Sequence, residues 1–269
     1  MRDVVVAAVQ MASRVGACED NARRMCTLLD EATEQGAQLV FFPEACLTGY
    51  SMDWARDIAL AADHACVRAV EEAACELGVA VGFGYIEAVG EGERPFVTYE
   101  VFDGARVLTY RKTHLGSREQ GVFAAGNSLP VCQAAGACVG VHLCWESHLP
   151  DISTTLRAHG AEILAVPHAA PAGGERRRSI WMRTLAARAY DNGAYVVACN
   201  ALRGEDDQSG HVGGGLAVFD PKGQVMADYY GEDEQVLVCT LPGRLPRDAS
   251  DDSMHSASYF DRRRPELYA

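Results

Sequence analysis

Runs of apolar residues long enough to form one strand alternate with helical patterns along most of this chain. The strand-length runs lie at residues 4–11, 37–42, 79–88 and 162–167, and the helical patterns lie at 21–36, 64–78 and 151–160. Each helical pattern ends at a glycine, a residue that readily adopts the left-handed conformation that stops a helix. This order predicts an α/β fold in which helices are layered against sheets.

Two further segments have the pattern of β-hairpins. Residues 97–112 form two strand-like runs around Asp103-Gly104, and residues 214–230 repeat that design around Pro221-Lys222-Gly223. Strands joined by a tight turn run antiparallel, whereas strands joined through a helix can run parallel. The sequence therefore predicts mixed sheets.

The chain has no low-complexity segment or linker that would divide it. Its 269 residues, 48% of them hydrophobic, are enough to bury a sizeable core, so we expect a single domain over residues 1–269. The polar composition of residues 244–269 predicts an extended C-terminal tail, and residues 171–178 have the composition of a loop.

The net charge of −13 argues against nucleic acid as a partner, because binding to phosphates requires a basic face. The first residues lack the apolar core of a secretory signal, and no apolar run approaches the length of about 18 residues that a membrane span needs. We therefore expect a cytoplasmic protein without membrane contacts. The ten cysteines are spread widely and include no CxxC pair, so we expect mostly buried free thiols and no metal site.

Three strand-like runs each end in a residue of chemical interest. Glu44 follows the run that stops at Pro43, Lys112 follows a predicted hairpin strand, and Cys144 follows the run 137–143. Loops beyond strand ends are where α/β folds gather their ligands. Together these residues would supply a base, a cation and a nucleophile.

Each of these types has a role in thiol chemistry. A cysteine at neutral pH is mostly protonated, so it needs a carboxylate to accept its proton or a cation to lower its pKa. Lys112 would stabilise the oxyanion formed when sulfur attacks a carbonyl or nitrile carbon, together with a backbone N–H after Cys144. Glu44 would move protons to the leaving amine and from the incoming water. Individually each residue is more often structural, and only their joint occurrence favours catalysis.

The same residues carry a family resemblance. The segments FFPEACLTGY, YRKTHL and GVHLCWESHLPD resemble, in the same order, three motifs of the carbon–nitrogen hydrolase or nitrilase superfamily, in its amidase-like branch. The resemblance implies a four-layer α-β-β-α sandwich with two mixed sheets, a catalytic triad of Glu44, Lys112 and Cys144, and a second glutamate, Glu119, beside Lys112. It also implies no cofactor and a homodimer or higher homo-oligomer.

The chain departs from that pattern after the nucleophile. Many amidases and carbamoylases of the family have an arginine where this chain has His148, so a substrate carboxylate is not expected to bind there. Trp145, His148, Tyr50 and His168 are the candidates for contacting substrate. Tyr50 could equally be plain packing, and His168 could equally be a structural histidine with internal partners.

These observations predict an amidase or carbamoylase that cleaves a small amide or carbamoyl compound through a thioester. A nitrilase that converts a nitrile to acid and ammonia is the alternative, because Cys-Trp-Glu also resembles the nitrilase motif. A third hypothesis is a non-catalytic sensor in which Cys144 responds to oxidation. An acyltransferase is disfavoured because the sequence has no predicted membrane spans.

Overall fold

A computed structural model describes residues 1–90, 92–203, 213–243 and 260–267. Its first sheet has six strands in the order β14-β1-β3-β4-β5-β6. The strands are β1 (Val4–Gln10), β3 (Leu39–Phe41), β4 (Ala80–Glu87), β5 (Phe96–Phe102), β6 (Arg106–Arg111) and β14 (Gln235–Leu241). Strands β1, β3 and β4 run parallel, and the other neighbours pair antiparallel.

The second sheet repeats this arrangement in the order β13-β12-β10-β9-β8-β7. Its strands are β7 (Val131–Ala134), β8 (Ala137–Val141), β9 (Ile163–His168), β10 (Tyr195–Asn200), β12 (Leu216–Phe219) and β13 (Val225–Tyr229). Strands β8, β9 and β10 are parallel and the outer pairs are antiparallel. A short parallel pair, β2 (Ala12–Ser13) with β11 (Leu202–Arg203), lies outside both sheets.

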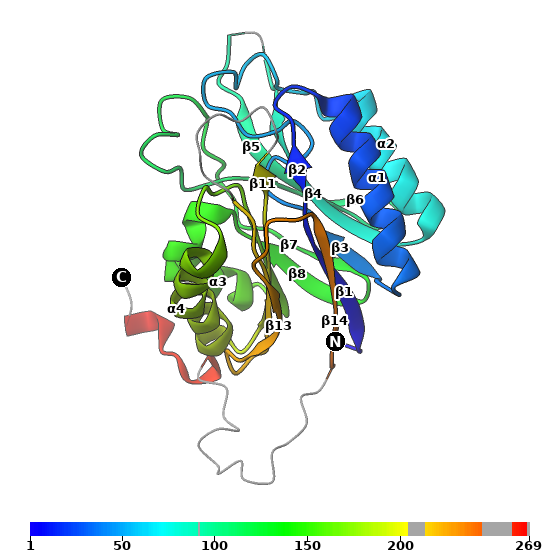
Figure 1. Cartoon of the computed structure of the whole chain (residues 1–269). Helices are drawn as coiled ribbons and strands as arrows, with labels where there is room; N and C mark the ends of the chain where they lie inside the picture. Colours follow the sequence, from blue (N-terminus) through cyan, green and yellow to red (C-terminus); the bar gives the residue numbers. More distant parts are fainter. Residues whose placement is uncertain (91, 204–212, 244–259, 268–269) are drawn as a thin grey trace.

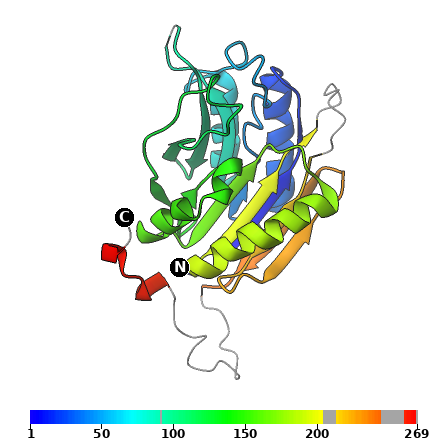
Figure 2. The same cartoon turned by 90° about the vertical axis from the view of Figure 1, so that its left-hand side faces the viewer.

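The two sheets pack face to face, and helices cover their outer faces (Figures 1 and 2). Helices α1 (Cys18–Glu34) and α2 (Ala65–Leu77) pack on the first sheet, in a core that includes Met25 of α1 and Phe83 of β4. Helices α3 (Pro150–Ala158) and α4 (Gly174–Asn192) cover the second sheet. Trp181 of α4 is fully buried in the core between this helix layer and the sheet. The predicted four-layer α-β-β-α sandwich with two mixed sheets is confirmed.

Both predicted hairpins are present, as β5-β6 and β12-β13, with Gly104 and Gly223 at positive φ in their turns. The loop predicted at residues 171–178 is wrong for its second half, because α4 begins at Gly174. Two consecutive glycines suggested a loop, but Gly173 is the N-cap and the residues after Gly174 are good helix formers. Among the described residues, no helix combines the length and apolar character needed to cross a bilayer.

The tail predicted at 244–269 lies mostly outside the described residues. Its described part contains two short 3₁₀ helices, η2 (Phe260–Arg262) and η3 (Pro265–Leu267). The guanidinium of Arg157 lies 5.3 Å from the centre of the Phe260 ring, so this part of the tail contacts α3.

Candidate active site

Glu44 lies just beyond β3, in a turn that brings it close to the neighbouring strand. The next residue, Ala45, has a left-handed φ of 52°. Gly84 of β4 makes this approach possible, because a Cβ at that position would lie 2.4 Å from the Ala45 nitrogen. The Glu44 side chain is buried, and its Oε2 accepts a hydrogen bond of 3.0 Å from the Ala169 N–H at the end of β9.

Lys112 follows the last residue of β6 and is 2% exposed. Its ammonium donates to Oε1 of Glu44 and to Oε1 of Glu119, each at 2.8 Å. Glu119 also accepts from the Tyr50 hydroxyl at 2.6 Å and from the Gly116 N–H at 2.6 Å. Two carboxylates therefore hold one buried ammonium, Glu44 from the turn after β3 and Glu119 from the chain that follows Lys112.

Cys144 begins a 3₁₀ helix, η1 (Cys144–His148), soon after β8 ends. Its φ of 42° lies in the left-handed region, which a residue with a side chain adopts only where the surroundings impose it. The strand runs into a sharp turn at this residue, which is only partly buried as a whole.

The three predicted reactive side chains line one pocket with a volume of about 300 Å³. Strands β3, β6, β8 and β9 all end at its wall. The remaining lining residues include Tyr50, Met52, Arg118, Glu119, Trp145, Ala169, Ala170 and Pro171. The structure thus brings Glu44 and Cys144, which are 100 positions apart in the chain, into one pocket.

The two carboxylates beside Lys112 differ in their acidity. Burial raises the pKa of Glu44 above its ordinary value, and the attraction of Lys112 only partly opposes this. Burial also acts to raise the pKa of Glu119, but Lys112, Tyr50 and the Gly116 N–H outweigh it, so the pKa of Glu119 is lowered. Glu44 is therefore the carboxylate better suited to gain and lose a proton.

The site raises the pKa of both the cation Lys112 and the thiol of Cys144. Burial acts to lower the pKa of Lys112, but Glu44, Cys144 and Glu119 outweigh it, so the pKa is raised and the ammonium stays charged. Burial and the charge of Glu44 raise the pKa of the Cys144 thiol to about 12, although Lys112 and Arg177 oppose them. In the resting site Cys144 is therefore a thiol, and it needs a base to react.

Glu146 is a functional candidate that the sequence reasoning missed. Its fully buried carboxylate accepts hydrogen bonds from the Leu143 N–H, the Tyr110 hydroxyl, the Thr113 N–H and hydroxyl, and the His114 N–H. These bonds fasten the Cys144 turn to the chain that follows Lys112. An acidic residue two positions after the cysteine was the available signal.

The four predicted substrate contacts have different environments. Tyr50 and Trp145 line the pocket, and the Trp145 side chain is 48% exposed. His148 is exposed and lies outside the pocket lining, with its ring 5.4 Å from that of Trp145. His168 is buried and absent from the pocket lining, with its Nδ1 close to the Val166 carbonyl and its Nε2 accepting from Trp181.

Arg177 has an unexpected position for one residue of a basic run. The residues on either side are exposed, but Arg177 is 4% exposed, with its guanidinium 5.4 Å from the centre of the Trp181 ring. Its Nε donates to the Ala172 carbonyl, and no carboxylate of the described residues forms an ion pair with it. Burial lowers the pKa of Arg177, and the charge of Cys144 acts in the opposite direction.

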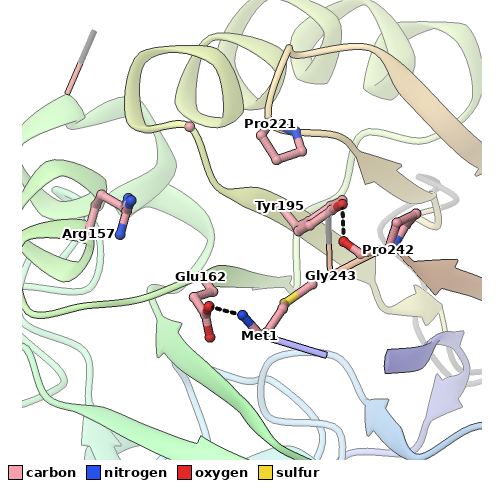
Figure 3. A pocket seen from close by; sticks show the side chains of 8 residues that line it. Met1, Arg157, Glu162, Tyr195, Pro221, Pro242 and Gly243 are labelled. Atoms are coloured by element: carbon pink, nitrogen blue, oxygen red, sulfur yellow. Dashed lines mark hydrogen bonds and ion pairs between the residues drawn. The ribbon is translucent and has the colours of Figure 1, made fainter. Parts of the chain in front are cut away.

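A second pocket, of about 270 Å³, contains no nucleophile of this kind (Figure 3). It is lined by Met1, Arg157, Glu162, Gly193, Tyr195, Pro221, Pro242 and Gly243. The terminal amine of Met1 pairs with Glu162 at 2.5 Å, and the Tyr195 hydroxyl donates to the Pro242 carbonyl. The polar groups of this pocket are therefore used within the fold.

Comparison with known sequences extends over most of the chain. The model of the carbon–nitrogen hydrolase family matches residues 5–245. The N-carbamoylputrescine amidase of Arabidopsis thaliana is 26% identical over 99% of this chain and 94% of its own length. The nitrilase of Pyrococcus abyssi is 28% identical over 98% of this chain and 99% of its own length.

Solved structures of an amidase from Nesterenkonia sp. AN1 share the fold, with a TM-score of 0.82 and 26% identity over 98% of this chain and 95% of that chain. One of them has the acetamide moiety of fluoroacetamide covalently added at the active-site cysteine of a Glu-to-Gln variant. Another contains butyramide bound to a Cys-to-Ala variant.

Proposed function

This chain belongs to the carbon–nitrogen hydrolase family, and we propose that it is an amidase whose substrates are small, uncharged amides. It is a hydrolase of C–N bonds other than peptide bonds. The observation that carries the proposal is the single pocket lined by Cys144, Glu44 and Lys112. Its chemistry is that of acyl transfer through sulfur.

In the proposed reaction Cys144 Sγ attacks the amide carbon while Glu44 accepts the thiol proton. The raised pKa of Glu44 suits this transfer, because the carboxyl group must also release the proton later. The charged Lys112 stabilises the oxygen anion of the tetrahedral intermediate. Glu44 then gives its proton to the leaving nitrogen, the C–N bond breaks, and ammonia departs from a thioester.

The second half of the reaction uses the same groups. Water loses a proton to Glu44 and attacks the thioester carbon, and Lys112 again stabilises the oxygen anion. The C–S bond breaks, the sulfur regains the proton from Glu44, and the carboxylic acid leaves. Glu119 is proposed to hold Lys112 in place and charged, since its lowered pKa leaves it a poor proton carrier.

The pocket supports an uncharged substrate. Lys112 is already paired with two carboxylates, and the other cation of the lining, Arg118, is exposed to solvent. Much of the remaining wall is formed by Tyr50, Met52, Trp145 and Pro171. Butyramide, which binds a related amidase, is a suitable probe of this size and chemistry.

The test is ammonia release from butyramide, the monoamide of succinic acid, an N-carbamoyl amine and butyronitrile. We expect kcat/KM for butyramide to exceed that for each charged amide by about tenfold or more. The reason is that burying an unpaired charge costs a charged substrate about 1.4 kcal/mol or more of transition-state stabilisation. Faster turnover of the nitrile, with acid formed directly, would favour the nitrilase alternative. Faster turnover of a charged amide would refute the uncharged substrate class.

We also propose that the protein is cytoplasmic, acts as a single domain over residues 1–269 and forms a homodimer. All ten cysteines are unbonded, as is usual in a reducing compartment. Tyr190 on α4 is 42% exposed, and exposed aromatic side chains are enriched where subunits meet. Sedimentation of the purified protein tests the dimer, and a monomeric mass at micromolar concentration would reject it.

A further inference from the structure

Cys18, His64 and Cys66 meet where the two helices of the first outer layer begin. Cys18 is the first residue of α1, His64 is the N-cap of α2, and Cys66 lies in the first turn of α2. The two sulfur atoms are 3.2 Å apart, and one possible ligand atom from each residue lies within 4.8 Å of the others. These residues lie outside the candidate active site.

The cluster has a buried side and a side that faces solvent. Cys18 and Cys66 are 8% and 5% exposed, whereas His64 is half-buried. The exposed Glu19 places its Oε2 3.4 Å from the Cys18 sulfur. A cation could therefore enter from the side of Glu19 and His64 and contact both sulfur atoms.

Without a cation, this grouping is electrostatically unfavourable for ionised thiols. Burial, with Cys66 and Glu19 adding to it, raises the pKa of Cys18 to about 12. Helices α1 and α2 both begin here, and the N-terminus of a helix favours negative charge. A divalent cation would remove the repulsion between two thiolates and leave the favourable helix ends.

We propose that Cys18, Cys66 and His64 bind a zinc ion, with Glu19 or water as the fourth ligand. Two sulfurs and an imidazole are characteristic zinc ligands, and binding would release the two thiol protons to solvent. Tetrahedral zinc separates such ligand atoms by about 3.5–3.8 Å, so small side-chain movements from the observed spacing suffice. The His64 Nδ1 would exchange its 3.2 Å hydrogen bond from the Cys66 N–H for the metal.

Such an ion would join α1 to α2 across their first turns. The chain just before α1 contacts the segment that follows Glu44, because the Gly16 N–H donates to the Thr48 carbonyl at 2.8 Å. The site would therefore stabilise the helical layer behind that segment without touching the pocket. Cys18 lies 46 residues before His64, which explains why sequence spacing gave no indication of it.

The experiment measures zinc binding to the full chain carrying Cys144→Ala, which removes the thiol of the candidate active site as a competing ligand. We expect one zinc ion per chain, release of two protons per ion, and a Tm increase of roughly 5 °C at a hundredfold excess of zinc over Kd. Adding Cys18→Ala or Cys66→Ala should lower the affinity at least about a hundredfold, and Glu19→Gln should lower it less. Cys75→Ala is the matched control, because Cys75 is an exposed cysteine of α2, the helix that carries Cys66, and it should leave the zinc affinity unchanged.

Cobalt substitution gives a readout that does not depend on stability. A sulfur-to-cobalt charge-transfer band should appear in the parent protein and in Cys75→Ala, and circular dichroism should show that the Cys18 and Cys66 variants are folded. Zinc affinity unchanged in both variants would overturn the proposal. Failure of the reduced parent to bind zinc would also overturn it, and so would isolation of the protein with a Cys18–Cys66 disulfide.

Discussion

The Glu146 carboxylate accepts two hydrogen bonds from Thr113, one from its N–H at 2.9 Å and one from its hydroxyl at 2.7 Å. Thr113 directly follows Lys112, and Glu146 lies two residues after Cys144. A single buried carboxylate thus links the chain that carries the ammonium to the turn that carries the thiol. Glu146 therefore limits how far the backbone beside Lys112 can move relative to the Cys144 turn.

Glu146→Gln should lower kcat by about tenfold or more and reduce the free energy of unfolding by about 1–3 kcal/mol. The amide presents one N–H₂ group to donors such as the Leu143 N–H and the Tyr110 hydroxyl, which leaves buried donors unpaired. Amide hydrolysis and urea unfolding measure the two effects.

Glu100→Gln is the matched control for that change. Glu100 is also a fully buried glutamate that accepts from a tyrosine hydroxyl, that of Tyr85, but it does not line the pocket. It should cost similar stability with kcat unchanged. A Glu146→Gln enzyme with full kcat would show that the link does not position the reacting groups.

Cys144→Ala should reduce amide hydrolysis to background, because no other nucleophilic sulfur lines the pocket in the described part of the chain. The far-UV spectrum and Tm should be nearly unchanged, since Cys144 is only partly buried as a whole and the left-handed φ is no more favourable for alanine. Ammonia release from butyramide is the measurement. Residual turnover above a few per cent would contradict the assignment of Cys144 as nucleophile.

Replacing each carboxylate beside Lys112 should separate their roles. Glu44→Gln should abolish turnover, because the carboxylate that remains, Glu119, has a lowered pKa and is a poor acceptor for the Cys144 proton. In the native enzyme activity should fall as pH drops through the pKa of Glu44, and burial places that limb above the ordinary range of a glutamate. In Glu119→Gln some activity should persist with the same acid limb. If Glu119→Gln no longer lost activity at low pH, Glu119 and not Glu44 would be the carboxylate that carries the proton.

The layers and the three reactive strand ends were predictable because they depend on local chemistry. Apolar periodicity identified the strands, glycine stops identified the helices, and motifs marked Glu44, Lys112 and Cys144. Glu146 and the Cys18–His64–Cys66 cluster were not recognised, and the burial of Arg177 was not expected, because these features depend on packing between distant segments. The resemblance suggested Glu119, but only the fold showed that it shares an ammonium with Glu44.

The alkylation rate of Cys144 by a neutral reagent such as iodoacetamide should rise about tenfold for each pH unit from pH 7 to pH 10. The reason is that its pKa is raised to about 12, so the thiolate fraction grows in proportion to hydroxide over this range. Peptide mapping follows Cys144 itself, and Cys144→Ala gives the background. A plateau near neutral pH would mean that the thiolate already exists in the resting enzyme.

The charges around the sulfur then predict opposite effects of two substitutions at a fixed pH. Glu44→Gln removes a negative charge that raises the pKa of Cys144, so alkylation should become at least about threefold faster although catalysis is lost. Arg177→Met removes a positive charge that lowers this pKa while keeping most of the stem, so alkylation should become slower. If neither substitution changed the rate, Cys144 would be electrostatically isolated from both groups, as the sensor hypothesis requires and the proposed hydrolase does not allow.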